Sequence, residues 1–122
     1  MDLHESGEMY LETILRLKQK NGNVRSVDIA NALNYTKPSV SRGMKLLKES
    51  HMIVIDSKGY IDFTDEGKAV AEKIYMLHKD ITQFLVSIGV SQSQAEQDAC
   101  RLEHIISDET FSCIQDFLKK HS

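Results

Sequence analysis

The chain has 122 residues, of which 41% are hydrophobic and 7% aromatic, and its formal net charge is −3. This length predicts one domain or two small ones. The sequence has no apolar run long enough to span a membrane, and its acidic start, MDLHESGEMY, lacks the apolar core of a signal peptide. Because the only two cysteines, Cys100 and Cys113, lie in a chain without an export signal, we expect a cytoplasmic protein without a structural disulfide.

The charge is unevenly distributed along the chain. Residues 1–60 carry nine Lys/Arg and seven Asp/Glu, whereas residues 61–122 carry six and eleven. The stretch TKPSVSRGMKLLK, residues 36–48, holds four basic residues and no acid. A local basic face is what a DNA-reading helix needs, whatever the total charge.

The first half begins with three expected helices. The first runs from about Ser6 to Asn21, and Ser26 caps a short second one. A tight turn over residues 34–36 leads to a third helix, whose first turn contains Pro38. The third helix turns Val40, Met44 and Leu47 inward. A short helix, a turn and a basic helix predict a helix-turn-helix.

A β-hairpin is expected directly after the basic helix. Residues 53–55 form a strand-like run, residues 57–59 a turn, and residues 60–63 the returning strand. This order predicts a winged helix that binds double-stranded operator DNA, and the alternative is a small α/β scaffold without a DNA role. The residues expected at the DNA are Ser26, Thr36, Lys37, Pro38, Ser39, Ser41, Arg42, Lys45 and Lys58.

The second half is expected to be all helical. Thr64 caps a long helix whose apolar residues recur at alternating spacings of about three and four, as in a coiled coil. These residues are Val70, Ile74, Leu77, Ile81, Phe84 and Ile88. Two more helices follow Ser91 and Ser107. The predicted division is residues 1–63 and 64–122, and surplus apolar residues after Phe84 predict a homodimer.

A possible metal site begins with Cys100, Glu103 and His104. At about 100° per residue these three side chains share one helix face, and thiolate, carboxylate and imidazole are ligands for a borderline-soft divalent metal. Met9 and Glu12 share a face of the first helix, His78 lies beside the long apolar seam, and Glu96 precedes Cys100 by one turn. Each residue alone also has a plain structural interpretation as a core or solvated side chain. Spacing cannot show that these helices meet.

Several of these segments together resemble one known family. EMYLETILRL, DACRLEH followed by ISDE, the helix-turn-helix between them and LH in the long helix are similar to the diphtheria toxin repressor and manganese transport regulator family. The resemblance covers nearly the whole chain. It implies a mainly α fold, with an N-terminal winged helix-turn-helix followed by an all-helical metal-binding and dimerisation domain. It also implies a metal-dependent transcriptional repressor and no enzyme.

Site residues follow from the resemblance by position. Met9, Cys100, Glu103 and His104 match primary ligands of the iron-responsive branch, His78 matches a ligand of both branches, and Glu12 matches a ligand of the manganese branch. Two departures stand out. Thr82 and Glu96 replace a glutamate and a histidine of the ancillary site, and the sequence ends at Ser122 without the SH3-like domain of the iron branch.

The expected mechanism is that Fe²⁺ or Mn²⁺ joins the first helix to the dimerising half and raises DNA affinity through linkage. A winged helix sensing an organic ligand in an apolar pocket is the rival hypothesis. A catalytic zinc site is another alternative, but HExxH or a similar motif is missing from the sequence. A purely structural dimer adaptor is the third. No membrane and no small organic substrate are expected as partners.

Overall fold

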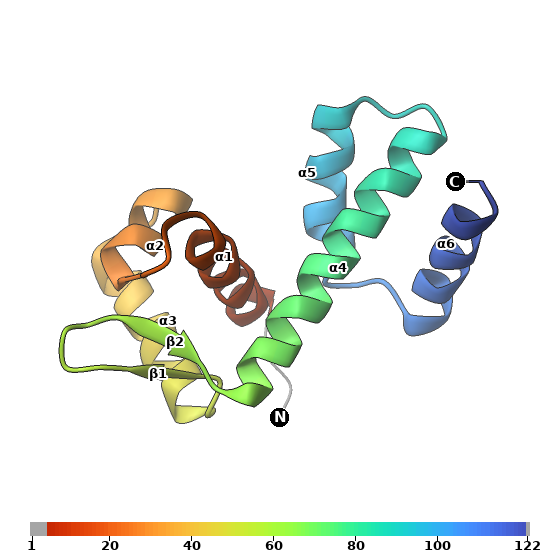
Figure 1. Cartoon of the computed structure of the whole chain (residues 1–122). Coiled ribbons are helices and arrows are strands. Elements are labelled where there is room, and N and C mark those ends of the chain that lie inside the picture. Colours follow the sequence, from red (N-terminus) through yellow and green to blue (C-terminus); the bar gives the residue numbers. More distant parts are fainter. Residues whose placement is uncertain (1–4, 122) are drawn as a thin grey trace. The chain divides into compact units, whose positions relative to one another are not determined.

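The computed structural model describes residues 5–121, and within this range the chain forms six helices and one two-stranded sheet (Figure 1). The residues divide into two compact units, and the division falls between Glu72 and Lys73. The boundary predicted at residue 63 separates the DNA-binding function from the metal-binding function, whereas the observed division is one of compactness. The functional boundary therefore stays a prediction. The mainly helical class, with a hairpin after the N-terminal helices and a helical remainder, is confirmed.

Three helices form most of the first unit: α1 (Glu5–Asn21), α2 (Ser26–Leu33) and α3 (Lys37–Glu49). Their apolar faces bury a common core. Its most buried members are Leu11, Ile14, Val24, Ile29, Val40, Met44 and Leu47. The three inward residues predicted for α3 are therefore confirmed.

Two predicted helix starts differ from the structure. The helix α1 already includes Glu5, so Ser6 lies inside it. Arg25, not Ser26, is the N-cap of α2. The reason is that the Asp28 carboxylate accepts a 2.8 Å hydrogen bond from the Arg25 backbone N–H, which places the helix start one residue earlier.

A hairpin completes the winged helix. Strands β1 (Ile53–Ile55) and β2 (Ile61–Phe63) pair antiparallel, with Val54 opposite Asp62. Between them, Gly59 adopts φ +86°, and the Asp56 side chain accepts from the backbone N–H groups of Lys58 and Tyr60. Lys18 of α1 lies 3.2 Å from the Asp62 carboxylate and so ties the hairpin to the helices.

The hairpin continues directly into the long helix α4 (Asp65–Ser87). The Thr64 hydroxyl accepts a 3.0 Å bond from Gly67 N–H, which confirms the predicted cap. The same hydroxyl donates to the His51 carbonyl at 2.7 Å. Gly67 approaches the chain so closely that an added Cβ would lie 1.8 Å from the Met52 carbonyl oxygen.

The second unit contains α4 from Lys73 onward, α5 (Gln92–Leu102) and α6 (Asp108–Lys120), with α5 and α6 on either side of α4 (Figure 1). Leu77, Ile81, Ala99 and Ile114 form its buried core. Ser91 and Ser107 cap α5 and α6 as predicted. Among the described residues, no helix is both long and apolar enough to cross a bilayer.

The burial of the apolar residues in this unit differs in part from the prediction. Ile88 lies past the end of α4 and is 57% exposed, because the chain turns at Gly89 with φ +111°. Among the surplus residues after Phe84, Ile105 is 75% exposed, and most of the others pack within the unit. The partly buried ones against its core are Phe84, Leu85, Leu102, Ile106, Phe111 and Leu118.

The helix expected to carry Cys100, Glu103 and His104 ends earlier than predicted. The helix α5 stops at Leu102, and Glu103 is its C-cap. The Glu103 N–H still bonds the Ala99 carbonyl at 2.9 Å, but the His104 N–H bonds Arg101 at 3.3 Å, three residues back. The chain therefore tightens into a turn at His104.

Candidate metal centre and nucleic-acid interface

Glu103 is the centre of a buried polar cluster in the second unit. Its side chain is fully buried at the end of α5, and one carboxylate oxygen, Oε2, lies 2.9 Å from His78 Nδ1 on α4. The other oxygen, Oε1, lies 3.4 Å from His104 Nε2 in the turn that follows α5. One carboxylate thus stands between two imidazoles.

The electrostatics of this cluster favour a cation. A buried carboxylate is costly unless a positive charge or hydrogen bonds compensate it. The His78 and His104 side chains are only 13% and 1% exposed. Either a protonated imidazole or a bound divalent ion can supply the charge, and imidazole nitrogens with a carboxylate oxygen are common ligands of first-row divalent metals.

The other candidates on this unit lie around the cluster in different environments. Cys100 is a half-buried cysteine on α5 that takes part in no disulfide. Glu96 is exposed and accepts a 3.1 Å bond from Gln92 Nε2, and together with His78 it lines an open depression of about 290 Å³. The Thr82 hydroxyl donates to the His78 backbone carbonyl at 2.7 Å, so it is used within its own helix.

The two candidates on α1 belong to the first unit, and both already have partners there. Glu12 is 6% exposed, unlike the solvated residue that its helix position suggested, and its Oε1 lies 2.8 Å from the Arg16 guanidinium. Met9 Sδ accepts a 3.4 Å hydrogen bond from the Tyr35 hydroxyl. Both side chains are therefore fixed by contacts inside the unit.

The N-terminal turn of α3 carries a polar network suited to DNA. The Thr36 hydroxyl caps the helix by accepting from Ser39 N–H at 3.3 Å and donates to the Ser39 hydroxyl at 2.8 Å. Arg42 Nη2 lies 3.5 Å from the same Ser39 oxygen. The other DNA candidates on this helix are exposed: Lys37, Pro38, Ser41 and Lys45.

Comparison with known proteins identifies the chain's relatives. The profile described as "Iron dependent repressor, N-terminal DNA binding domain" matches residues 2–68. The profile described as "Iron dependent repressor, metal binding and dimerisation domain" matches residues 64–122. The chain belongs to the iron-dependent repressor family.

Individual relatives cover both branches of this family. The transcriptional regulator MntR of Escherichia coli O6:H1 is 32% identical over 92% of this chain and 72% of its own length. The diphtheria toxin repressor of Corynebacterium diphtheriae is 29% identical over 88% and 48%. The structure of the manganese regulator SloR superposes with a TM-score of 0.82 at 25% identity, over 98% of this chain and 55% of that one. The chain therefore spans about half the length of the last two proteins.

Family membership confirms the predicted class, a metal-dependent, DNA-binding transcriptional repressor rather than an enzyme. The individual ligand and DNA-contact assignments stay predictions. Within the second unit, the structure brings His78, Glu103 and His104 together.

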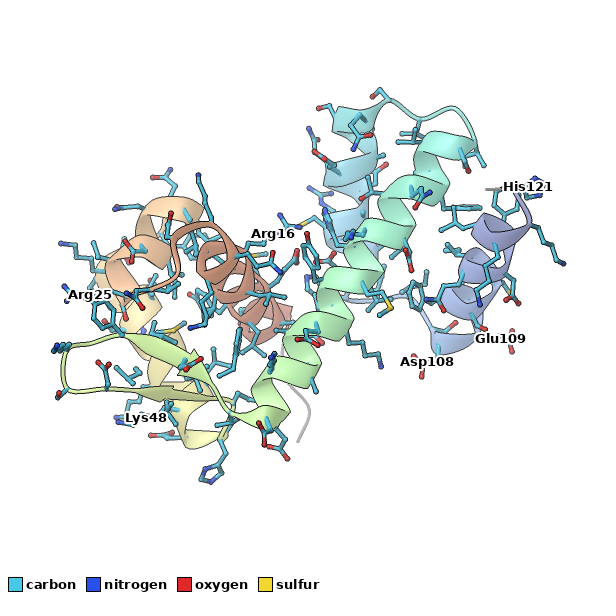
Figure 2. The ribbon with its side chains drawn as sticks, viewed as in Figure 1. Arg16, Arg25, Lys48, Asp108, Glu109 and His121 are labelled. Carbon is cyan, nitrogen blue, oxygen red and sulfur yellow. The ribbon has the colours of Figure 1, made fainter. Side chains whose placement is uncertain are left out.

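Sequence reasoning also missed residues at these sites. The Arg25 guanidinium lies 4.5 Å from the centre of the Tyr60 ring, beside the hairpin (Figure 2). This contact joins residues far apart in sequence and has no local signal. Arg16, by contrast, stands four residues after Glu12, a spacing that predicts an ion pair on one helix face.

Proposed function

We propose that this member of the iron-dependent repressor family is a cytoplasmic homodimer whose operator binding is increased by Fe²⁺ or Mn²⁺. The observation that supports the metal switch is the buried arrangement of Glu103 between His78 and His104. The exposed basic residues Lys37, Arg42 and Lys45 on α3 support the DNA function.

We assign the metal ligands as follows. On the second unit, His78, Glu103 and His104 would hold the ion, and Cys100 of α5 would supply a thiolate. By the family resemblance, Glu12 and Met9 of the DNA-binding unit would bind the same ion from α1. Glu96, which shares the open depression with His78, is the candidate for an additional site.

This ligand set gives a mechanism by linkage. When bound, the ion supplies a positive charge that several anionic and neutral donors can share. Met9 and Glu12 can bind it only if α1 takes one position relative to the dimerising half, and the spacing of the two winged helices in the dimer is then fixed. These residues would hold the ion more tightly in the DNA-competent arrangement than in others, and bound metal would then raise DNA affinity by linkage.

The proposed donor atoms favour metal ions of intermediate softness. Cys100 and Met9 favour softer ions such as Fe²⁺ over Mg²⁺ or Ca²⁺, whereas two carboxylates and two imidazoles also suit Mn²⁺. The chain thus combines the sulfur ligands of one branch with the Glu12 carboxylate of the other.

At the DNA, Ser39, Ser41, Arg42 and Lys45 are assigned to the groove. Lys37 and Lys58 are assigned to DNA phosphates. Ser26, Thr36 and Pro38 are assigned to the DNA-facing surface without a specified contact. The Ser39 hydroxyl beside Arg42 would orient the guanidinium toward the bases.

The rival hypothesis, an organic ligand, is less well supported by the second unit. The depression beside His78 is lined mostly by polar or charged side chains, and Val86 is the single apolar residue in its lining. Binding sites for small organic molecules are predominantly apolar. The depression is also open to solvent, so it would not enclose a small organic ligand as such sites do.

Metal content and DNA binding of one purified sample test the proposal. Operator fragments selected from random sequence should bind in the presence of Mn²⁺ or anaerobic Fe²⁺ and dissociate when a chelator is added. Glu103→Gln should lose the metal response but retain its fold, as checked by circular dichroism. Gln94→Glu, at an exposed position on α5, is the matched control. DNA binding that is unchanged by chelation would contradict the metal switch.

A further inference from the structure

Tyr35 lies at the point where the chain enters the DNA-reading helix. It follows Asn34, which has a left-handed φ of 57°, and it precedes Thr36, the N-cap of α3. Its backbone N–H bonds the Ala30 carbonyl at 3.0 Å, so the main chain of the turn is fixed. The side chain, 43% exposed, is directed by other contacts.

Those contacts are with α1. The Tyr35 ring packs edge-on against the Tyr10 ring, with centroids 6.2 Å apart and planes at 88°. Its hydroxyl donates to Met9 Sδ at 3.4 Å. Tyr10 in turn packs against Gly43 of α3, where an added Cβ would lie 2.3 Å from the ring. The turn, α1 and α3 therefore share one set of contacts, with the Met9 sulfur at one end.

We propose that Tyr35 is a positioning residue for the metal centre, whose hydroxyl holds the Met9 sulfur and thereby opposes metal binding by that sulfur. The inference rests on the proposed role of Met9 as a ligand. A thioether that gives electron density to a cation becomes a poorer hydrogen-bond acceptor. The hydrogen bond and the metal bond then weaken each other, and by reciprocity metal loosens the hold of α1 on the turn before α3.

The expected change in metal affinity follows from the free energy of one neutral hydrogen bond. Such a bond contributes on the order of 0.5–1 kcal/mol, which corresponds to about a two- to fivefold change in affinity. Removal of the Tyr35 hydroxyl should therefore tighten metal binding by about two- to fivefold. The ring contact with Tyr10 is retained in Tyr35→Phe, so the fold and the turn should be unchanged.

The contact itself can be tested without metal. The chain has five methionines, so ¹³C-methyl methionine labelling gives a short spectrum in which Met9→Leu identifies the Met9 signal. In metal-free protein, Tyr35→Phe should shift the Met9 methyl signal. Tyr60→Phe is the matched control, because Tyr60 lies against Arg25 in the wing, and it should leave this signal in place. An unmoved Met9 signal in Tyr35→Phe would overturn the inference.

The opposition between the Tyr35–Met9 hydrogen bond and metal binding is then measured by titrating the full chain with Zn²⁺, a diamagnetic ion. Tyr35→Phe should bind it about two- to fivefold more tightly than wild type, and this gain should vanish in a Met9→Leu background. Equal affinities of wild type and Tyr35→Phe, or a gain that persists without Met9, would overturn the inference. A wild-type chain that binds no Zn²⁺, Mn²⁺ or Fe²⁺ would instead overturn the proposed function, and with it the metal half of this inference.

Discussion

Glu103 owes its position to the way α5 ends. As the C-cap it keeps a helical backbone, and this directs its carboxylate toward His78 on α4, while the tighter turn after it brings His104 to the other oxygen. A carboxylate held by two imidazoles from different elements has little freedom to rearrange. Any ion bound here meets donors whose orientation is already fixed, which lowers the entropic cost of binding.

Cys100 is the position where we expect metal preference to be set. Cys100→Glu replaces a soft thiolate by a hard carboxylate, so the DNA-binding response should shift toward Mn²⁺ and away from Co²⁺. DNA titrations with Mn²⁺, anaerobic Fe²⁺ and Co²⁺ measure this. In parallel, His104→Ala should lose the response to all three ions. A His104→Ala variant that responds like wild type would show that this cluster is structural.

Arg42 is expected to read a base. Arg42→Ala should weaken specific operator binding by about 1–3 kcal/mol, the usual value of a good base contact, and leave metal affinity and dimerisation unchanged. Fluorescence anisotropy with operator and random DNA separates specific from non-specific loss. Lys48→Ala, in the last turn of the same helix, is the control and should affect both DNAs alike. Unchanged operator affinity of Arg42→Ala would refute the assignment.

Asp62 makes a small, pH-dependent contribution to the wing. The Phe63 N–H bond, with help from Lys18, lowers the pKa of the Asp62 carboxyl below its ordinary value. A lowered folded-state pKa means that the stabilisation is present above the unfolded-state pKa of about 3.9 and is lost as pH falls through the folded value. The unfolding free energy of wild type should therefore exceed that of Asp62→Asn at about pH 6, by less than about 1 kcal/mol because the side chain is largely exposed. The difference should shrink as the pH falls below the unfolded-state pKa of about 3.9. A gap that widens in acid would contradict this.

At the scale of elements, the hairpin and α4 meet at Gly67. Among the described glycines, Gly67 leaves the least room for an added Cβ. Gly67→Ala would bring a methyl carbon onto the Met52 carbonyl, and neither backbone can move without breaking the Thr64 bonds. We expect a loss of about 1–3 kcal/mol in unfolding free energy, measured by urea denaturation. Lys68→Ala, at the exposed neighbouring position, should change stability by less than about 0.5 kcal/mol. A stable Gly67→Ala variant would show that this joint is loose.

A helix start is predictable from a local signal where a Ser or Thr side chain caps it, whereas the starts predicted at Ser6 and Ser26 were wrong. Thr36, Thr64, Ser91 and Ser107 cap through hydrogen bonds to residues three positions ahead, so the signal is local. The helix α5 ends in a tightened turn that contains no glycine, so the usual signal for a helix end is missing. The spacing of Cys100, Glu103 and His104 instead predicted that the helix continues through His104. The hydrogen bond from the Tyr35 hydroxyl to the Met9 sulfur joins residues 26 positions apart, so the sequence pattern did not predict it either.

At the scale of the whole molecule, the fold class and the repressor family were predictable because element order and two motifs, EMYL and DACRLEH, lie within the sequence itself. The pairing of His78 with Glu103 was not, because it joins α4 to the end of α5 across 25 positions. Spacing fixes which side chains share a face of one helix, but only tertiary packing decides which faces meet.

The dimer is the prediction that belongs to this scale. The surplus of apolar residues is mostly packed within the second unit, so the argument now rests on the match of residues 64–122 to a dimerisation domain and on exposed residues such as Met76, 50% accessible on α4. We expect a dimer in sedimentation at micromolar concentration, weakened by Met76→Asp. Leu46→Asp, at a similarly exposed residue of α3, should not change the mass. A monomeric wild type, with or without metal, would contradict the prediction.

Thr64 has a practical consequence for anyone who dissects the protein into fragments. A DNA-binding fragment that stops at Phe63 omits the hydroxyl that bonds the His51 carbonyl and the N–H that bonds Met52. It would leave the second strand without its anchor and expose the Met52 backbone that Gly67 covers. A fragment extended to Glu72 retains the first two turns of α4 and with them the closed end of the wing.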